Sequence, residues 1–232
     1  MHFYLILAAA LPALWLIRHY VKSDAYPEPT GLILKTAGVG IVIVIPIIIL
    51  ELLLMTQLNS ITGTVGRAFF QAFVVAGFIE ELLKYLALKK YCARKSEFDE
   101  PMDAIVYAVV ISLGFALLEN VMYVLQSAEE DLASGFMVAA FRACTAVPAH
   151  ASFGVIMGFH FANQHFTRAS NIIPKALLLP ILWHGSYDFL LFLQHPVALL
   201  LFIPFLIYMI RKARNLHLIR KNEQRSQRIN IS

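Results

Sequence analysis

Residues 76–88 read AGFIEELLKYLAL, so two adjacent carboxylates, Glu80 and Glu81, stand inside an otherwise largely apolar helical segment. An ionised side chain at the centre of a membrane helix costs about 3 kcal/mol on insertion scales. Two neighbouring carboxylates also repel one another, and a proton on one of them relieves that repulsion. We therefore expect this pair to hold water, a metal ion or a proton.

The composition is that of a membrane protein. The chain has 232 residues, of which 59% are hydrophobic and only 15% are charged, against about 25% charged in soluble domains. Mean hydropathy is +0.69. The net charge of +4 comes mostly from the C-terminal tail and short loops, which fits an anionic bilayer surface better than nucleic acid. Two cysteines, Cys92 and Cys144, provide no disulfide framework.

Apolar runs that approach the ~20 residues needed to span a bilayer predict an all-α, polytopic membrane bundle of about seven transmembrane helices. The predicted helices cover residues 3–17, 31–56, 67–89, 102–126, 135–162, 172–194 and 197–210. No soluble domain or internal repeat is visible, so residues 1–232 are interpreted as a single integral membrane domain. The basic cytoplasmic tail 211–232 is expected to be a surface helix or disordered.

The loop charges predict that the N-terminus is outside and the C-terminus inside, because cytoplasmic loops of membrane proteins are rich in Lys and Arg. The first helix has no basic residue before it and Arg18 and Lys22 after it, which favours an uncleaved anchor over a cleaved signal. Basic residues gather in segments 18–22, 89–95, 168–175 and 211–228, whereas segments 57–66, 126–134 and 194–196 contain none.

Lys84 and Arg142 are basic residues within predicted spans, and each needs a partner. Lys84 follows Glu80 by four positions and Glu81 by three. On a helix it can therefore neutralise one carboxylate and leave the other free to carry a proton. The alternative is a structural ion-pair cluster that joins helices.

A third carboxylate, Glu119, stands in the next predicted helix beside Asn120. Its face also carries Ser112, Phe115 and Tyr123 at helical spacing. A single glutamate at this depth can be a packing hydrogen-bond partner. A third intramembrane carboxylate nevertheless strengthens the case for a functional site.

The fifth predicted helix carries His150, followed at intervals of four residues by Gly154 and Gly158. Small residues at this spacing allow another helix backbone to approach closely, so we expect His150 to point into a packed interface. Pro148 removes a backbone donor and predicts a kink nearby. The alternative role for His150 is a simple hydrogen-bond partner.

His184 and Asp188 lie one helical turn apart in the sixth predicted helix. Asp188 can accept from one imidazole nitrogen of His184 and so fix the tautomer that the other nitrogen presents. The alternative is structural pairing. Because four helices each carry ionisable groups near the middle of the bilayer, we expect them to form one buried polar chamber.

These motifs resemble the PrsW family of intramembrane proteases, within the wider superfamily of CAAX-protease-like membrane proteins. The resemblance covers about residues 67–194, which we interpret as the catalytic core. That superfamily commonly has a histidine at the position of Glu119, so Glu119-Asn120 favours PrsW over the prenyl-protein proteases. The matching pieces occur in the family's order on four successive helices: Glu80-Glu81-x-x-Lys84, Phe115-x-x-x-Glu119-Asn120, His150 and His184-x-x-x-Asp188.

The resemblance implies a multi-pass protease of the bacterial cytoplasmic membrane. Its implied substrate is a single-pass anti-sigma factor, and its implied reaction is the first (site-1) cut of a stress-response cascade that releases a sigma factor. The expected partners are this membrane protein and the lipid bilayer, with no nucleic acid.

Hydrolysis of an amide needs an activated water and a stabilised oxyanion. Glu80 or Glu81 is the natural general base. His150, His184 or the Asn120 amide can donate to the oxyanion. The residues alone do not choose among these donors or between the two glutamates.

Zinc chemistry is the alternative to this mechanism. His150 and His184 can ligate zinc together with Glu80 or Glu81, and Glu119 can serve as a further ligand or base. The sequence has no H-E-x-x-H motif, so we favour metal-independent glutamate chemistry. The cofactor thus stays open between none and zinc.

Three other functions compete with this interpretation. Buried carboxylates and histidines also build the proton relays of transporters, although no internal repeat or pair of broken helices is visible here. A non-catalytic membrane scaffold would use the same polar groups to join helices. A CAAX-type protease would cut a different substrate. Cleavage by the purified protein separates the first two from a protease, and the product identifies the third.

Overall fold

The computed structural model describes residues 2–167 and 174–231, and within these residues all regular structure is helical. The seven predicted helices correspond to seven helical rods, although residues 172 and 173 of the sixth lie outside the described residues. The rods are α1 (His2–Ser23); α2 (Thr30–Val42) with α3 (Val44–Met55); α4 (Thr64–Phe69), the π-helical segment η2 (Phe70–Phe78) and α5 (Ile79–Lys90); α6 (Pro101–Ala128); α7 (Leu132–Cys144) with α8 (Ala146–Thr167); α9 (Lys175–Phe192); and α10 (Pro196–Ile231). Two short 3₁₀ turns, η1 (Thr56–Ser60) and η3 (Cys92–Arg94), follow α3 and α5.

Two rods are interrupted by one residue each, and a proline explains each interruption. Pro46 cannot donate to the carbonyl of Val42, the last residue of α2. Pro148 likewise cannot donate to Cys144, the last residue of α7. The local disruption expected from Pro148 is therefore present, as a break of the helix between α7 and α8.

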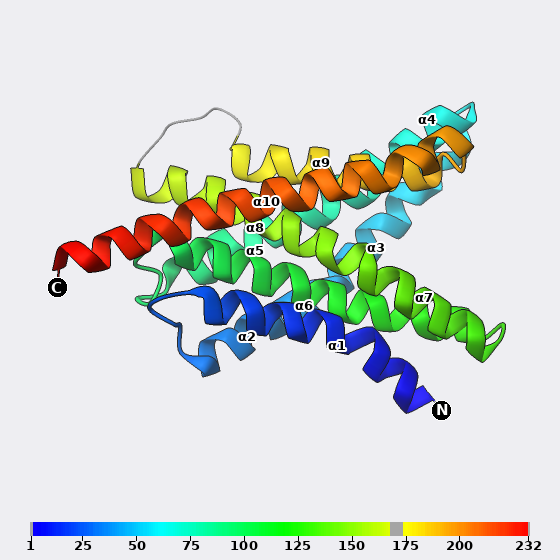
Figure 1. The fold of residues 1–232 in the computed structure, drawn as a ribbon. Coiled ribbons are helices and arrows are strands. Elements are labelled where there is room, and N and C mark those ends of the chain that lie inside the picture. The colour runs from blue at the N-terminus through cyan, green and yellow to red at the C-terminus, as the bar shows by residue number, and fades with distance from the viewer. Residues whose placement is uncertain (1, 168–173, 232) are drawn as a thin grey trace.

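Helix α6 lies at the centre of the bundle, where it contacts α1, α2, α5, α7 and α8 (Figure 1). Its approach to α8 depends on the two glycines of that helix. A Cβ atom on Gly158 would lie 2.5 Å from the Cα of Ile105, and one on Gly154 would lie 2.8 Å from the Cα of Val109. The predicted close backbone approach is confirmed, and it fixes the position of His150 relative to α6.

The last helix continues through the basic tail, which the sequence predicted to be either a surface helix or disordered. The predicted span ends at residue 210, whereas α10 runs on without a break to Ile231. Ala213 and Leu216 continue its apolar face and are buried, and Gln224 is only 3% exposed. Because these side chains pack against the bundle, the basic tail is a docked helix.

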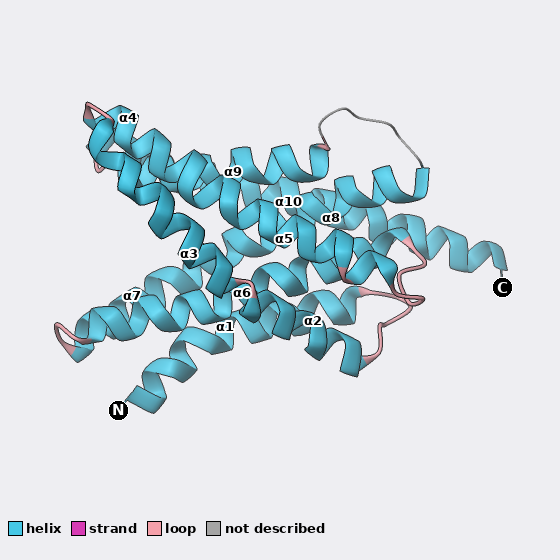
Figure 2. Cartoon of the chain, turned by 180° about the vertical axis from the view of Figure 1, so that it is seen from behind, coloured by secondary structure: helices cyan, strands magenta, loops and turns pink. Residues whose placement is uncertain are grey.

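The ends of the rods agree with the loop charges. The N-terminus, the α3–α4 turn and the α6–α7 turn lie at one end of the bundle, and the C-terminus lies at the opposite end (Figures 1 and 2). Two of the turns that lack Lys and Arg therefore share an end with the N-terminus, as the predicted topology requires. The N-out, C-in orientation itself remains a prediction.

Five of the rods are long and apolar enough to cross a membrane, so the chain is a multi-pass membrane protein. They are His2–Ser23, Thr30–Ser60, Pro101–Ala128, Leu132–Thr167 and Pro196–Ser226. The other two rods, α4–η2–α5 and α9, carry the Glu-Glu pair and the His184–Asp188 pair. Ionisable side chains lower the mean hydropathy of a helix. The polar groups of these two rods therefore explain why the rods are not among the five.

Candidate active site

The rod α4–η2–α5 and helix α9 approach each other closely at a pair of glycines. A Cβ atom on Gly185 would lie 2.7 Å from a ring carbon of Phe73, and one on Gly77 would lie 3.1 Å from the backbone nitrogen of Gly185. A side chain at either position would push the helices apart. The close approach brings the carboxylate pair at the start of α5 against the middle of α9.

The π-helical segment η2 immediately precedes that pair. A π-helical turn holds more residues than an α-helical turn, so it rotates everything that follows it about the helix axis. Such segments are frequent at functional sites. Here η2 ends at Phe78 and α5 begins at Ile79, so the rotation sets the directions of Glu80 and Glu81.

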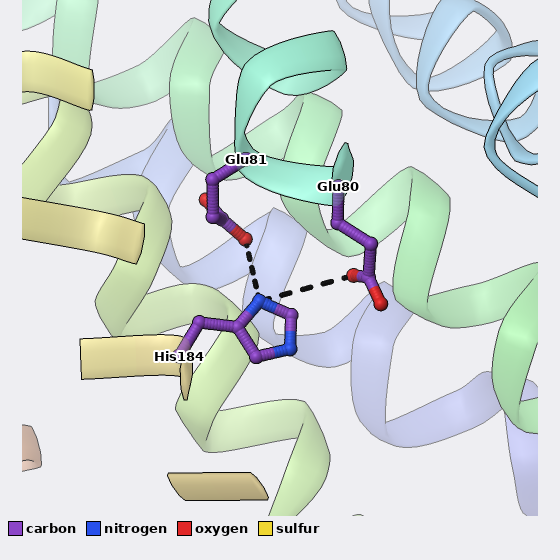
Figure 3. A group of neighbouring side chains, drawn as sticks. All are labelled: Glu80, Glu81 and His184. Carbon is purple, nitrogen blue, oxygen red and sulfur yellow. Dashed lines mark hydrogen bonds and ion pairs between the residues drawn. The ribbon is translucent and has the colours of Figure 1, made fainter. Parts of the chain in front are cut away.

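His184 faces both glutamates (Figure 3). Its Nδ1 atom lies 2.9 Å from Oε1 of Glu81 and 3.9 Å from Oε2 of Glu80. Its Nε2 atom lies 3.2 Å from Oδ2 of Asp188, one turn further along α9. The predicted pairing of His184 with Asp188 is thus confirmed, and the imidazole bridges carboxylates on two helices.

Lys84 contacts both glutamates rather than neutralising one and leaving the other free. Its Nζ atom lies 2.9 Å from Oε2 of Glu80 and 2.9 Å from Oε1 of Glu81. The same ammonium lies 3.3 Å from Nδ1 of His150 and 4.1 Å from the ring centre of Phe115. Lys84 is 1% exposed, so its charge is balanced by these buried groups and not by water.

The opposite wall of the site is built around Glu119. Its Oε2 atom lies 3.1 Å from Nε2 of His150 and accepts a hydrogen bond of 2.6 Å from Arg142. Arg142 also donates to the side-chain oxygen of Asn120 at 2.6 Å. The partner that Arg142 was expected to need is therefore the Glu119-Asn120 pair. Ser112 donates to the backbone carbonyl of His150 at 2.7 Å and so supports this wall from α6.

Aromatic rings hold the two histidines in place. Phe153 of α8 stacks on His184, with ring centres 4.6 Å apart and an interplanar angle of 15°. The rings of His150 and His184 meet edge to face at 5.4 Å. Because rings in such contacts cannot turn freely, each imidazole presents fixed nitrogen atoms to its carboxylate partner.

A cavity of about 620 Å³ lies beside these groups. Five predicted site residues line its wall: Glu80, Glu119, His150, His184 and Asp188. The other three lie behind that wall and are buried: Glu81, Lys84 and Asn120. The structure thus distinguishes the two adjacent glutamates, because only Glu80 faces the space that a substrate can fill.

Besides the predicted site residues, an arginine and a glutamate line the cavity. Arg142 was noted only as a charge in need of a partner, and Glu51 of α3 was not singled out. Glu51 is the sole ionisable residue between Lys35 and Arg67, within a long apolar run. That isolation is a sequence signal, because an intramembrane charge is a functional candidate by default.

The donor set at the centre of the site fits a divalent metal ion. Glu80, Glu81 and His184 each offer one ligand atom, and these atoms lie within 4.8 Å of one another. The Oε2 atom of Glu81 is buried and has no hydrogen-bond partner. Imidazole and carboxylate groups are usual zinc ligands. The zinc alternative based on the sequence also used His150 as a ligand. In the structure, the Nδ1 atom of His150 instead faces Lys84.

A polytopic helical bundle that gathers carboxylates and imidazoles around a membrane-embedded cavity has the site of an intramembrane hydrolase. Comparison with known proteins makes the assignment specific. The model of the PrsW family, described as intramembrane metalloproteases, matches residues 28–210, and the chain belongs to this family.

Several relatives named Protease PrsW match most of the chain. Identity to the one from Geobacillus kaustophilus is 35% over 192 residues, which covers 82% of this chain and 80% of the relative. For Bacillus subtilis it is 34% over 221 residues, covering 91% and 95%. For Clostridioides difficile it is 34% over 208 residues, covering 88% and 85%. No solved structure matches the chain.

The protein is therefore an intramembrane protease, and the resemblance inferred from its motifs is confirmed. This membership decides against the transporter and scaffold alternatives. The family description also names a metalloprotease, which favours the metal alternative over the metal-independent chemistry that the sequence alone led us to prefer.

Proposed function

We propose that this protease cuts a single-pass membrane protein of the anti-sigma-factor type, making the site-1 cut that starts a stress-response cascade. The observation that carries the proposal is the cavity of about 620 Å³ within the bundle, because polar catalytic groups and apolar side chains form one wall. Such a cavity suits a peptide segment that is itself embedded in the bilayer.

Substrate access is lateral in this proposal. Leu52 of α3 and Phe141 of α7 both line the cavity, and both are also exposed on the outside of the bundle, at 64% and 50%. Exposed apolar side chains at the rim of an intramembrane cavity face lipid. A transmembrane segment can therefore reach the cavity between α3 and α7 without passing through water.

The substrate helix must unwind before it is cut, since a helical amide is shielded by its own hydrogen bonds. Residues of low helix propensity such as Gly, Ser or Pro next to the cleaved bond lower that cost. The polar groups of the cavity then receive the released backbone carbonyl and N–H.

Within the site, we assign the role of general base to Glu80, because it lines the cavity. Glu80 takes a proton from water as the water oxygen attacks the scissile carbonyl carbon. The proton then passes to the leaving nitrogen. Arg142 and His150 carry N–H donors in the same wall and can stabilise the oxyanion. Lys84 and Asp188 are positioning residues, since they hold Glu80 and His184 respectively.

A divalent metal would be held by Glu81 and His184, and the Glu80 carboxylate lies within 4.8 Å of their ligand atoms. When bound, such an ion supplies a Lewis acid that polarises the scissile carbonyl or the attacking water. Lys84 holds Glu81 from the side of α5, and Asp188 holds His184 from α9. These contacts keep the two donors in a fixed mutual geometry.

The test uses the purified full-length protease in nanodiscs with a single-pass anti-sigma factor as substrate. The new terminus of the product is sequenced. A cut on the extracytoplasmic side of the substrate's transmembrane segment supports the proposal. A cut on the cytoplasmic side, or cleavage only of soluble or lipidated proteins, would reject it in favour of the CAAX-type alternative.

A further inference from the structure

A second group of carboxylates lies where α1 ends and α6 begins, far from the protease site. Asp24, Glu100 and Asp103 each offer an oxygen, and these oxygens lie within 4.8 Å of one another. The Glu28 carboxyl group adjoins that of Asp103 and accepts a hydrogen bond from the Tyr107 hydroxyl. The α1–α2 loop and the start of α6 thus bring four carboxylates together in one group.

Hydrogen bonds account for only part of this arrangement. Oδ2 of Asp103 accepts from two backbone N–H groups before α6, at 2.9 and 2.7 Å. Oδ1 of Asp24 accepts from the side-chain amide of Gln224 at 2.6 Å. The second oxygen of each aspartate, Oδ1 of Asp103 and Oδ2 of Asp24, is buried and has no donor. Asp103 is 0% exposed and Asp24 is 6% exposed, so bulk water does not reach these two side chains.

Among the side chains that the structure describes, in residues 2–167 and 174–226, no Lys, Arg or His forms an ion pair with any of the four carboxylates. The ion pairs found there lie at the protease site and at Arg220. The start of α6 contributes about half a positive charge through its helix dipole, far less than four carboxylates require. Buried carboxylates without a counter-charge are costly, so a cation or protons must occupy the point where they meet.

We propose that this carboxylate group binds a hard divalent cation, Mg²⁺ or Ca²⁺. The donors are all oxygens, which these ions prefer, whereas zinc sites usually include nitrogen or sulfur. Gln224 donates from α10 to both Asp24 and Glu100, so a bound cation fastens the docked end of α10 to the α1–α2 loop and to α6. The site shares no residue with the protease site and does not rest on the proposed substrate.

The test is thermal unfolding of the purified full-length protein, titrated separately with MgCl₂ and CaCl₂ after removal of metals. At a cation concentration of ~100 times the dissociation constant, we expect Tm to rise by about 5 °C. Glu28→Gln and Asp103→Asn should abolish this rise. Glu97→Gln should retain it in full, because Glu97 lies in the same loop but pairs with Ser96 and not with the group.

Two controls separate this site from other effects. Glu81→Gln, which alters the protease site, should leave the cation-induced rise unchanged. If Asp103→Asn fails to fold because Asp103 also caps α6, Glu28→Gln decides alone, since Glu28 caps no helix. The ion that acts at the lower concentration identifies the natural occupant.

Three results would overturn the proposal. One is a Tm that neither ion raises; if both variants then also unfold at a higher temperature than the wild type, shared protons hold the group together. Another is a cation-induced rise that persists in either folded variant. The third is a rise that disappears in Glu97→Gln or in Glu81→Gln.

Discussion

The Nδ1 atom of His184 lies 2.9 Å from Oε1 of Glu81, although 103 positions separate the two residues in the chain. The ammonium of Lys84 lies 2.9 Å from the same oxygen. One carboxylate oxygen thus fixes both a histidine and a lysine, while the other oxygen of Glu81 has no hydrogen-bond partner. We therefore propose that Glu81 positions His184 and Lys84, and that Glu80, which lies in the cavity wall, is the glutamate that meets the substrate.

The two glutamates should respond differently to neutralisation. Glu80→Gln should lower turnover by at least ~100-fold, the lower range of a general acid–base contribution, and should keep any bound metal. Glu81→Gln should lower turnover by a similar factor and also lose the metal, because Glu81 is the carboxylate held against His184. Initial cleavage rates and metal content of both purified variants provide the measurement. Near-normal cleavage by both would exclude the glutamate mechanism.

Metal dependence has a separate test. If Glu81 and His184 hold a divalent ion, strong chelators should abolish cleavage, and the metal should return activity when added back. His184→Ala should contain little metal, whereas His150→Ala should retain it, because Nδ1 of His150 faces Lys84. Full activity in the presence of chelators, together with no stoichiometric metal, would restore the metal-independent mechanism.

We expect Glu51, in the cavity wall, to lower the stability of the folded protein. It forms no hydrogen bond or ion pair with the described residues, although it stands in an apolar helix. Glu51→Gln should therefore raise stability by about 1 kcal/mol, which is a Tm rise of about 2–4 °C. Glu129→Gln, at an exposed position in the α6–α7 turn, is the control and should change Tm little. A lower Tm for Glu51→Gln would indicate a bonding role that the structure does not show.

The packing of α8 on α6 should be sensitive to one methyl group. A Cβ atom on Gly158 would lie 2.5 Å from the Cα of Ile105, so Gly158→Ala must push two backbones apart. We expect a loss of about 1–3 kcal/mol in stability and a fall in activity, since α8 also carries His150. Gly31→Ala is the matched control, because a Cβ there meets nothing within 4 Å. Equal stability of both variants would contradict the close packing.

The predicted orientation can be tested by cysteine labelling in whole cells. Burial raises the pKa of the Cys92 thiol to about 12, so Cys92 should not react and only Cys144 needs to be replaced first. Single cysteines at Ser60 and Glu130 should react with a membrane-impermeant reagent, whereas one at Lys95 should react only after the membrane is opened. The opposite pattern would reverse the assigned topology.

The sequence by itself determined the local features of this protein. Apolar runs located the seven helical rods, and Pro148 located a break, because both depend on neighbouring residues only. The contacts of Lys84 with Glu80 and Glu81, and of His184 with Asp188, follow from helical spacing. The four motifs, in their order along the chain, were sufficient to indicate the PrsW family.

Only the tertiary structure decided how those helices face one another. Helical periodicity fixes the directions of side chains within one helix, but it does not fix the rotation of one helix against another. The π-helical segment η2 adds a rotation that no spacing rule anticipated. The tertiary structure therefore assigned Glu80 to the cavity and Glu81 to the interior, paired Arg142 with Glu119, and placed Glu51 in the cavity wall. The extension of α10 was decided in the same way, since Gln224 is ordered by carboxylates far away in the sequence.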